Sequence, residues 1–538
     1  MISTIVGIIV YIMSAIGIYQ LILPTLSFRV IGGTLFILIF GSMGIVLGYI
    51  LYLKIRKKSL KEISYKFLII EYALILITIL IGAILSSTLF NSKKMYNQLG
   101  EIKDEVFTED ISPIDNTQIP TVDKELAKKQ GEKELGKISS LGSQVTLGDF
   151  TMCQVNGKLL YVAPLEHTGF FKWSSQKTTP AYITVSATDS SDVKMIKEVN
   201  GEEVKLKYLH SAFLGDDLIR HIRNSGYRSE GLTDYSFELN DEGRPYYVIT
   251  VFENKAIWGM PEATGVLICD VQTGEINKYN LNEVPEWVDR VQPEKFINEQ
   301  INNYGKLIHG VFNFSNKDKI QKTPDTITVY NNGNCYYYTG LTSVGSDEAT
   351  VGFIMVDTKT KKAVRFSMGG ATEDAAMRSA EGLVQDMEYK ATEPVPLNLN
   401  GIPTYFMTLK DQEGLVKQYA LVNIQNYSVS VVGNTIDEVK RNYVSKMNTT
   451  QNKGTFSDES YKYVLEGNVS RISSNVEGGN TFYFMVLDSE PKKVFMASYT
   501  ISEELPITNK DDKVKIYCMD DKETINDILK FDNLNFGE

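Results

Sequence analysis

The chain has 538 residues, with 55 Lys and Arg against 66 Asp and Glu and a formal net charge of −11. A nucleic-acid-binding protein needs a basic stripe or patch, so this acidic balance disfavours a nucleic-acid role. The 30 tyrosines and 24 phenylalanines indicate folded, β-rich domains and exclude a disordered chain.

Three long apolar stretches open the chain, at residues 1–28, 30–53 and 67–90. Each exceeds the roughly 20 residues that a helix needs to cross about 30 Å of hydrocarbon. We therefore predict a three-helix transmembrane region over residues 1–92. The only charged residue inside the three stretches is Glu71. Because it lies a few residues from Lys66, we predict an interfacial, snorkelled or salt-bridged carboxyl rather than a proton relay.

The link between the second and third stretches, residues 54–66, has six basic residues against Glu62. Short loops rich in Lys and Arg stay on the cytoplasmic side. The sequence thus predicts a multi-pass cell-membrane protein with a cytoplasmic N-terminus and a large extracytoplasmic C-terminal part. Lys93 and Lys94, just after the third apolar stretch, favour the opposite orientation, but they are two basic residues against the six of the link. A signal peptide is the alternative for the first stretch, but no basic residue precedes it and a second apolar stretch follows at once.

The region after the apolar stretches begins with residues 93–143, which are charged and helical in pattern. This pattern predicts a juxtamembrane helical stalk, with Thr121 as a helix cap before an acidic first turn. Short alternating strands then begin, and the dipeptide Asn156-Gly157 is a strong signal for a hairpin turn. We predict an α+β module over residues 144–234.

Two further segments, residues 235–330 and 331–448, repeat a theme. Each contains strand pairs, a strand that ends in an Asp-containing turn with Thr or Gly, and an amphipathic helix. The turns lie at residues 270–276 and 357–361. Short helices are expected at residues 216–224, 293–304, 373–387 and 435–444.

Two of these motifs carry a resemblance to a known family. The hairpin that starts with GIPTYF at 401–406 and the strand ending DVQTGEI at 270–276 resemble PepSY-type modules. PepSY-type modules are small extracytoplasmic domains of bacteria, built from a helix and an antiparallel sheet. The resemblance implies PepSY-like module 1 over residues 235–330 and PepSY-like module 2 over residues 331–448.

A broader resemblance rests on the stretches PLEH at 164–167 and GGATE at 369–373. In these the chain is similar to a group of bacterial membrane proteins loosely described as cell-shape determinants. The resemblance implies a protein of the bacterial cell envelope, and it implies no particular chemistry.

The C-terminal part is a polar stretch followed by a compact series of strands. The polar composition of residues 449–458 predicts a linker. Residues 459–538 are similar to small OB-like barrels, which often bind oligonucleotides or sugars on a strand face. With so few basic residues we favour a packing or protein-contact role for this domain. Its strands are expected at residues 463–472, 481–487, 493–500 and 513–518.

The predicted fold class is α+β: three N-terminal transmembrane helices, a multidomain ectodomain of antiparallel sheets with short helices, and a C-terminal OB-like β-barrel. The four cysteines have no CxxC or metal-ligand spacing. Disulfides are an alternative outside the cell, but most of the cysteines lie in strand-like runs where a buried free thiol is common. We predict free core thiols at Cys153, Cys269, Cys335 and Cys518.

No catalytic motif is present: the sequence has no HExxH, G-x-S-x-G elbow, P-loop or kinase signature. His167 beside Glu166 could belong to a polar pocket, but a lone histidine next to aromatic residues is more often a satisfied structural residue. The glycines at 369–370 could let a helix N-terminus bind an anion, whereas Thr372 favours an ordinary cap. We predict no catalytic, cofactor-binding or metal-binding residues and no cofactor.

The first functional hypothesis is a non-enzymatic, membrane-anchored extracytoplasmic scaffold or regulator. Its expected partners are the lipid bilayer and a cell-envelope protein or wall component, with the oligomeric state open. The second is a regulator or inhibitor of an envelope protease, or an enzyme with a weak signature, which two nearby buried carboxylates of raised pKa in a cleft would favour. The third is an accessory subunit of a membrane transport or secretion complex.

Overall fold

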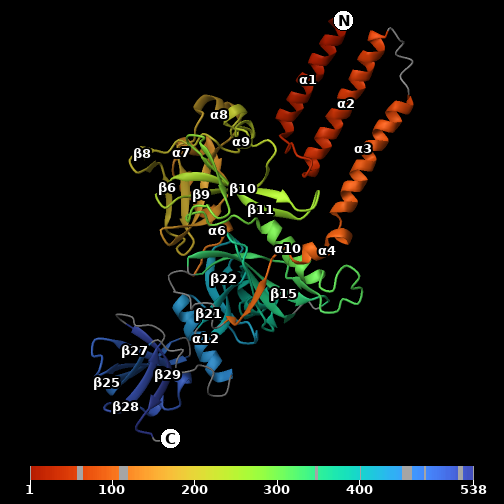
Figure 1. The fold of residues 1–538 in the computed structure, drawn as a ribbon. Coiled ribbons are helices and arrows are strands. Elements are labelled where there is room, and N and C mark those ends of the chain that lie inside the picture. Colours follow the sequence, from red (N-terminus) through yellow and green to blue (C-terminus); the bar gives the residue numbers. More distant parts are fainter. Residues whose placement is uncertain are drawn as a thin grey trace. The chain divides into compact units, whose positions relative to one another are not determined.

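The computed structural model describes residues 2–56, 65–107, 119–331, 333–345, 349–399, 401–450, 463–477, 480–518 and 525–536. Figure 1 shows the ribbon coloured along the chain. The chain divides into two compact units. Unit 1 comprises Met1–Lys103, Pro120–Thr339 and Ile354–Val364. Unit 2 comprises Asp104–Ile119, Gly340–Phe353 and Arg365–Glu538.

Unit 1 opens with three apolar helices, α1 (Ile2–Ile22), α2 (Ile31–Ile55) and α3 (Tyr65–Ser86). Two stretches, Ile31–Ile55 and Leu68–Tyr96, are long and apolar enough to cross a membrane, and the apolar helix Val6–Ile22 is shorter. Within an apolar 18-residue window of each long stretch, 6% is buried inside the protein, unlike the core helix of a soluble domain. Apolar anchoring near the N-terminus is therefore compatible with the structure, while the third span stays a prediction.

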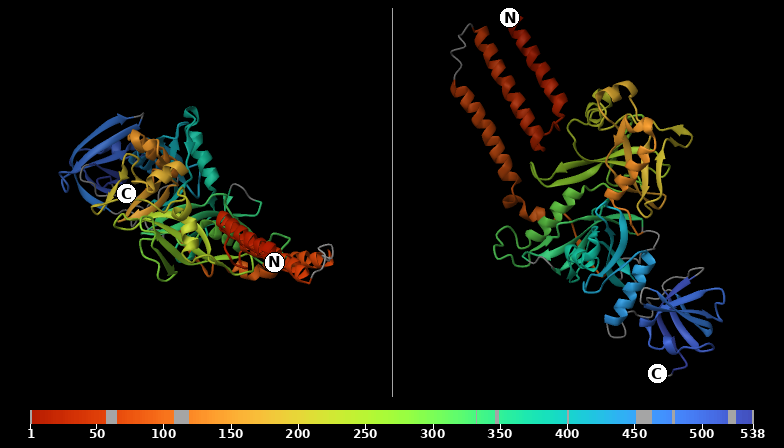
Figure 2. Two further views of the ribbon diagram at one scale, coloured as in Figure 1. Left: turned by 90° about the horizontal axis from the view of Figure 1, so that it is seen from above. Right: turned by 180° about the vertical axis from the view of Figure 1, so that it is seen from behind.

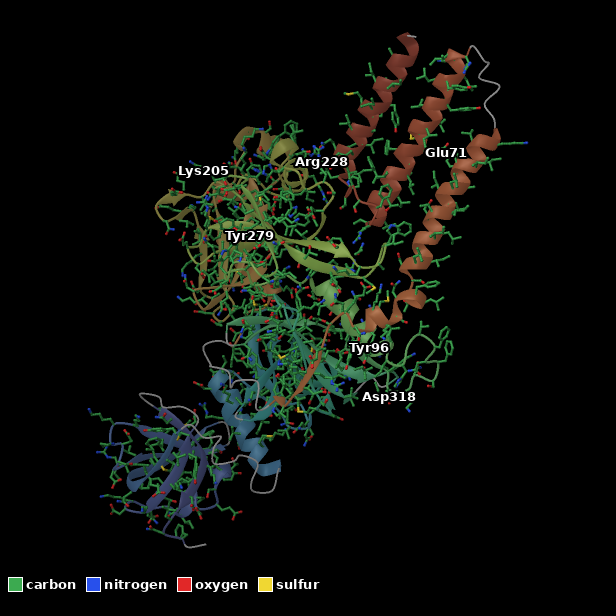
Figure 3. All side chains as sticks on the ribbon, in the orientation of Figure 1. Glu71, Tyr96, Lys205, Arg228, Tyr279 and Asp318 are labelled. Atoms are coloured by element: carbon green, nitrogen blue, oxygen red, sulfur yellow. The ribbon has the colours of Figure 1, made fainter. Side chains whose placement is uncertain are left out.

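Glu71 lies in α3, and Figure 3 labels it. Both of its carboxylate oxygens are buried and have no hydrogen-bond partner among the described residues. The side chain of Lys66 is exposed, so the salt-bridged form of the sequence prediction is wrong within the described part of the chain. Residues 57–64 of the predicted cytoplasmic link lie outside that part.

Helix α4 (Thr88–Tyr96) follows α3 and ends at Tyr96, which Figure 3 labels. The Tyr96 ring stacks on Tyr304 with ring centroids 5.3 Å apart. Helix α6 (Lys124–Gly136) begins at Asp123, whose carboxylate accepts a hydrogen bond from the backbone N–H of Leu126. The predicted cap, Thr121, instead donates its hydroxyl to the backbone oxygen of Thr188.

The stalk predicted over residues 93–143 therefore differs in the structure, because α6 packs against β5 and β6 of the first sheet. Its buried face includes Gly131, where a side chain would lie 2.8 Å from the ring of Phe150. This glycine lets the helix approach the sheet closely. The first sheet has the order β2-β4-β5-β6, with β3 paired to β4. Its strands are β2 (Val145–Leu147), β3 (Thr151–Val155), β4 (Lys158–His167), β5 (Tyr182–Ser186) and β6 (Val193–Ile196).

Short elements occur before the first sheet, within it, and between it and the second sheet. They are α7 (Ser139–Gly142), α8 (Phe170–Gln176), β7 (Glu198–Val199), β8 (Glu202–Glu203) and α9 (Leu218–Asn224). The second sheet is an antiparallel meander of order β12-β11-β10-β9, and α10 (Glu294–Lys306) follows it. Its strands are β9 (Gly231–Leu239), β10 (Pro245–Asn254), β11 (Pro261–Asp270) and β12 (Ile276–Asn280).

One apolar core joins the first two sheets. It contains Cys153 and Val162 from the first sheet, Leu206 between the sheets, and Phe237 and Leu267 from the second. Because burying apolar surface is the main favourable term in folding, this shared core makes the two sheets one body. The core thus runs across the boundary that the sequence predicted at residues 234–235.

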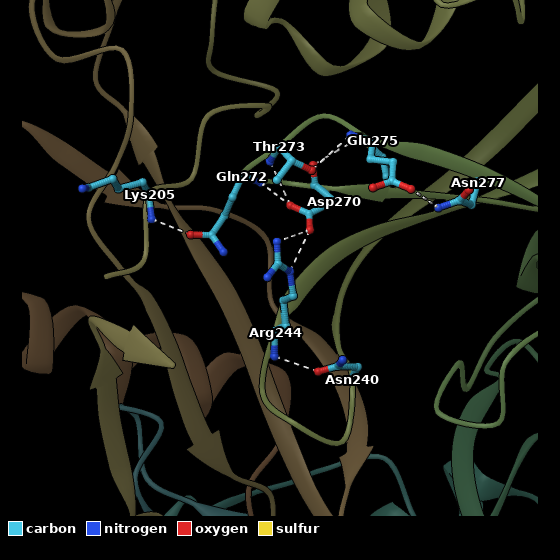
Figure 4. Close-up of polar contacts among 9 residues, drawn as sticks. Lys205, Asn240, Arg244, Asp270, Gln272, Thr273, Glu275 and Asn277 are labelled. Atoms are coloured by element: carbon cyan, nitrogen blue, oxygen red, sulfur yellow. Dashed lines mark hydrogen bonds and ion pairs between the residues drawn. The ribbon is translucent and has the colours of Figure 1, made fainter. Parts of the chain in front are cut away.

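The recurring Asp turn is confirmed in two places. At the end of β11, one oxygen of Asp270 accepts the backbone N–H groups two and three residues further on, at 2.8 and 2.9 Å. Asp357 makes the same pair of bonds at 2.9 and 2.6 Å. Figure 4 shows that Arg244 holds the other oxygen of Asp270, with both nitrogen contacts at 2.7 Å.

A six-stranded sheet has the order β1-β18-β17-β15-β13, with β14 paired to β15. Strands β16 and β19, from the same part of the chain, form a separate two-stranded sheet. The strands are β1 (Ile102–Glu105), β13 (Ile320–Lys322), β14 (Ile327–Asn331), β15 (Asn334–Ser343), β16 (Ala349–Thr350), β17 (Gly352–Asp357), β18 (Ala363–Phe366) and β19 (Gly370–Ala371).

Unit 2 holds a sheet of order β20-β22-β23-β24, with β21 paired to β22. Helices α11 (Glu373–Leu383) and α12 (Ile436–Thr450) pack against it. The ordinary cap predicted for α11 is confirmed, because the Thr372 hydroxyl accepts from the Ala375 N–H at 3.2 Å. The strands are β20 (Lys390–Ala391), β21 (Val395–Leu399), β22 (Ile402–Lys410), β23 (Val416–Asn423) and β24 (Ser430–Gly433).

The C-terminal strands close into a barrel of order β25-β26-β27-β29-β28, seen in blue in Figure 2. The predicted small β-barrel is confirmed, while residues 451–458 of the predicted linker lie outside the described residues. The four cysteines are free and buried, as predicted. The barrel strands are β25 (Tyr463–Glu477), β26 (Asn480–Leu487), β27 (Val494–Ser498), β28 (Lys513–Cys518) and β29 (Ile525–Asn533).

Candidate functional site

A cavity of about 510 Å³ lies in unit 1, and we call it the His167 pocket. Its walls come from α6, from β2 and the loop after it, from the end of β4, from residues 210–211, and from β9 and β10. The size is within the range of small-molecule sites. The polar and aromatic residues that define it are Asp149, Glu166, His167, His210, Tyr235 and Tyr247.

Glu166 and His167 reach the pocket as the last two residues of β4. Strand β2 pairs with this end of β4, so that Val145 lies opposite His167. Ser211 then fixes a distant segment to the same place. Its backbone N–H donates to Glu166 Oε2 at 2.8 Å, and its Oγ accepts the backbone N–H of His167 at 2.8 Å. These two bonds hold His210 at the pocket.

Aromatic rings form another part of the pocket lining. The His210 ring meets Tyr235 and Tyr247 edge-on, with centroids 5.5 and 5.2 Å apart. The Tyr247 hydroxyl donates to Glu166 Oε1 across 3.5 Å. Burial, followed by the nearby Glu166 carboxylate, raises the pKa of Tyr247 well above its ordinary value. The phenol therefore stays protonated and keeps its role as a hydrogen-bond donor.

His167 is the unusual residue of the pocket. Its side chain is buried, with 4% of the residue exposed, and neither ring nitrogen has a hydrogen-bond partner among the described residues. Burial lowers the pKa of His167, and the nearby Asp216 carboxylate opposes this effect only in part. A neutral imidazole has one N–H donor and one acceptor nitrogen, and leaving both unpaired in a buried place costs free energy. The prediction of a satisfied structural histidine is wrong; the polar-pocket interpretation is the one that fits.

The other two histidines have local partners. His221 Nε2 lies 2.8 Å from the backbone oxygen of Gly274, and His309 Nε2 lies 2.8 Å from Asp318 Oδ2. No group of three or more metal-ligating side chains occurs among the described residues. The residues that line the His167 pocket offer hydrogen-bonding groups, charged side chains and aromatic rings.

Sequence reasoning named Glu166 and His167 but missed the residues that complete the pocket. His210 and Ser211 are more than 40 positions away in the chain and lie in a stretch without a regular strand or helix. Polar residues on well-ordered loops frequently supply binding groups. Their position in such a loop was the one local signal that could have identified His210 and Ser211. No local sequence pattern identifies Tyr235 and Tyr247 as pocket residues, because they reach the pocket only through the packing of the second sheet on the first.

Glu238 and Asp289 form a second buried polar cluster. Ser236 Oγ donates to Glu238 Oε1 at 2.6 Å, and the Gln154 N–H donates to Asp289 Oδ2 at 2.6 Å. Burial raises the pKa of Glu238 to about 7, with Asp289 adding to the rise and Arg290 opposing it. Burial also raises the pKa of Asp289.

The sequence-based criterion for catalysis is a pair of nearby buried carboxylates of raised pKa, located in a cleft. Glu238 and Asp289 meet only the first part of this criterion. Neither Glu238 nor Asp289 lines the His167 pocket. Their oxygens are also held by neighbouring donors, among them the Asp289 N–H, which reaches Glu238 Oε2 at 3.4 Å. This cluster is therefore interpreted as structural.

Unit 2 has a smaller cavity of about 310 Å³ that is lined by residues of α12 and of the barrel strands β26, β27 and β29. Arg441 Nη1 and Asp527 Oδ1 lie 3.7 Å apart in its wall. The lining mixes apolar side chains, among them Val431, Phe482 and Met496, with polar and charged ones. Its position beside α12 agrees with a packing role for this side of the barrel.

No protein-family model matches the chain, and no curated protein matches it. Among solved structures it is similar to a glycosyl hydrolase from Bacteroides ovatus, at 12% identity over 77% of this chain and 96% of that chain, with a TM-score of 0.17. It is also similar to a levansucrase mutant from B. megaterium, at 10% identity over 82% of this chain and 97% of that chain, with a TM-score of 0.18. Likenesses at these TM-scores carry no argument about activity.

Proposed function

We propose that the protein is a non-enzymatic, membrane-anchored extracytoplasmic scaffold or regulator that binds a cell-wall fragment in the His167 pocket. The observation that supports a binding role is the buried His167, whose donor and acceptor nitrogens both lack a partner among the described residues. A ligand with hydroxyl and amide groups would supply both partners. The alternatives of a protease regulator or a transport subunit rest on the sequence alone and stay predictions.

Contacts inside unit 1 support the proposed three-span topology. The backbone N–H of Trp258 donates to Ser86 Oγ at 2.9 Å, at the end of α3. The indole N–H of the same residue donates to the backbone oxygen of Phe28 at 3.1 Å, in the turn after α1. The turn after the first apolar helix and the end of the third thus meet one residue. Three spans put these two points on the same side of a bilayer, which we propose is the outer side.

The finer fold assignments belong to the same proposal. We propose PepSY-like module 1 over residues 235–330 and PepSY-like module 2 over residues 331–448; the first stretch contains α10 and antiparallel strands, and the second contains α11 and antiparallel strands. The barrel pairs β27 with β29 in parallel, while its other neighbouring strands are antiparallel. A five-stranded closed barrel of this kind agrees with an OB-like domain.

The lining of the pocket favours a sugar-peptide ligand. Tyr235 and Tyr247 offer aromatic surface, and such rings bury apolar faces while their hydroxyls take part in hydrogen bonds. Glu166 and His167 add an acceptor and a donor–acceptor pair at the buried end. Lys124 also lines the cavity and is exposed, so it suits a peptide carboxylate. Wall fragments combine these chemical groups.

The test is isothermal titration of the full-length protein in lipid nanodiscs with soluble muropeptides from a muramidase digest of peptidoglycan. We expect saturable binding that the variant His167→Leu weakens at least tenfold. The variant His309→Ala is the matched control, because that histidine pairs with Asp318 at an exposed position, and it should bind like the wild type. An absence of muropeptide binding, or equal affinity in His167→Leu, would refute the proposed ligand class.

A further inference from the structure

Four apolar side chains form an exposed group beside the first sheet, and we call it the aromatic patch: Phe170, Phe171, Phe213 and Leu214. Their exposed fractions are 46%, 85%, 37% and 61%. The first two open helix α8, and the other two precede α9. An exposed apolar group of this kind marks a contact surface, because water-exposed aromatic area is costly.

The patch is assembled before any partner binds. The rings of Phe170 and Phe213 meet edge-on with centroids 5.3 Å apart, and the Trp173 ring lies 5.7 Å from Phe213. Trp173 is buried, and its indole N–H donates to Asp216 Oδ2 at 3.2 Å. These contacts fix α8 on the loop that carries Leu214, so the exposed rings are held outward on a supported base.

Lysines surround the aromatic patch. Lys177 Nζ lies 3.6 Å from the centre of the Trp173 ring, and Lys172 is exposed between the aromatic residues of α8. Lys207 Nζ lies 3.6 Å from Asp216 Oδ1, so the acidic residue under the patch is already paired. Aromatic rings with lysines around them match the membrane–water interface, where rings sit at headgroup depth and ammonium groups meet lipid phosphates.

The chain also holds the patch next to the ends of its apolar helices. The last turn of α1 and the turn between α1 and α2 are bonded to α9, and the backbone N–H of Leu26 also donates to the backbone oxygen of Arg228, in the loop after α9, at 2.7 Å. Arg220 donates to the backbone oxygen of Gln20 at 3.0 Å, and Arg223 donates to Thr25 Oγ1 at 2.9 Å. Figure 1 and the right panel of Figure 2 show α8 and α9 side by side near that end of α1. A surface fixed to the turn between two spans lies at the level where the chain leaves the hydrocarbon.

We infer that the aromatic patch inserts into the headgroup region of the outer leaflet and holds the first sheet of unit 1 against the bilayer surface. This contact is additional to the spanning helices, and it rests on the membrane orientation proposed above. The lysines add attraction to anionic lipids, so the contact is stronger on a bilayer that contains phosphatidylglycerol than on a neutral one. The bound surface would also fix the direction in which the His167 pocket opens relative to the membrane.

The experiment places one nitroxide label at a time on the full-length chain in nanodiscs of phosphatidylethanolamine and phosphatidylglycerol. The test site is Phe171→Cys, and the matched control is Phe314→Cys, an equally exposed phenylalanine of unit 1 at 84%. Ile45→Cys in α2 is the hydrocarbon reference. The four native cysteines are buried, so the wild-type chain measures background labelling. The readout is the ratio of the label's accessibility to oxygen over its accessibility to a water-soluble nickel complex.

We expect the Phe171→Cys label to have a ratio several-fold above that of Phe314→Cys and below that of Ile45→Cys. The difference should shrink in nanodiscs of phosphatidylcholine alone. Equal ratios at Phe171→Cys and Phe314→Cys, with a high ratio at Ile45→Cys, would overturn the lipid contact and leave the membrane anchor in place. A low ratio at Ile45→Cys would overturn the anchor itself and the inference with it.

Discussion

Replacing Glu238 by glutamine should remove most of the pH dependence of the second sheet's stability. The Glu238 carboxyl is fully buried, and burial raises its pKa from the ordinary 4.5 to about 7. The folded chain therefore binds this proton more tightly than the unfolded chain. Its stabilising contribution is complete below pH 4.5 and is lost as the pH rises towards 7. At about 1.4 kcal/mol for each pH unit in that window, the loss is roughly 3 kcal/mol.

Hydrogen exchange measured by mass spectrometry on β9 and β10 gives the free energy of opening for this region, after correction for the intrinsic exchange rate. Between pH 5 and pH 8 we expect the protection of the slowest amides in the wild type to fall about a hundredfold. Asp289, whose pKa is also raised by burial, acts in the same direction. In Glu238→Gln the fall should be much smaller, so that the variant is better protected than the wild type at pH 8.

Glu242→Gln is the control, because this glutamate lies on the exposed turn of the same hairpin, and it should keep the wild-type pH dependence. Protection that stays constant or rises from pH 5 to pH 8 in the wild type would refute the reasoning. It would mean that the Glu238 carboxyl is ionised in the folded chain and that Arg290 outweighs the cost of burial.

All three tryptophans lie in unit 1, so urea unfolding followed by their fluorescence tests further substitutions. Gly274→Ala should cost more than about 2 kcal/mol, because φ is +78° and a side chain would lie 2.4 Å from the Tyr208 ring. Gly310→Ala, with a φ of +80° and open space, should cost about 1 kcal/mol; equal costs would contradict the steric argument. Asp270→Ala should destabilise unit 1 by roughly 1–3 kcal/mol more than Asp357→Ala, because only Asp270 also holds a guanidinium in the described structure. Equal losses would show that the Arg244 pair adds nothing. Thiol labelling of the unreduced chain should count four thiols after unfolding and almost none before, and a lower count after unfolding would reveal a disulfide among Cys153, Cys269, Cys335 and Cys518.

Features that depend on a few neighbouring residues could be predicted from the sequence. The helix expected at residues 293–304 is α10, and the Thr372 cap and the two Asp turns form as their local patterns indicate. The alternating pattern predicts individual barrel strands, whereas closure of the barrel joins distant residues, since Tyr463 of β25 pairs with Cys518 of β28. For the helix, the cap and the turns, the decisive interactions join residues that are near in the chain, so pattern and composition are enough.

The His167 pocket could be predicted only in part because its parts come from distant positions. Glu166 and Ser211 are 45 residues apart, and Tyr247 is 81 residues from Glu166. Nothing in the local sequence around Ser211 specifies that its backbone will pair with a carboxylate of β4. The docking of α6 on the first sheet has the same cause, since the cap and spacing of a helix do not say which surface will cover its apolar face.

The bond between Arg223 and Thr25 joins positions 198 residues apart, and it has a consequence for how the chain is made. The two apolar helices that flank Thr25 are synthesised long before Arg223 leaves the ribosome. The guanidinium also donates to the backbone oxygens of Tyr227 and Glu230, which are near it in the chain. Its distant partner is Thr25, between the first two helices. A chain whose first helices fail to insert is left with a buried cation short of one acceptor. We therefore expect insertion of the first two helices and folding of α9 to be coupled through the side chain of Arg223.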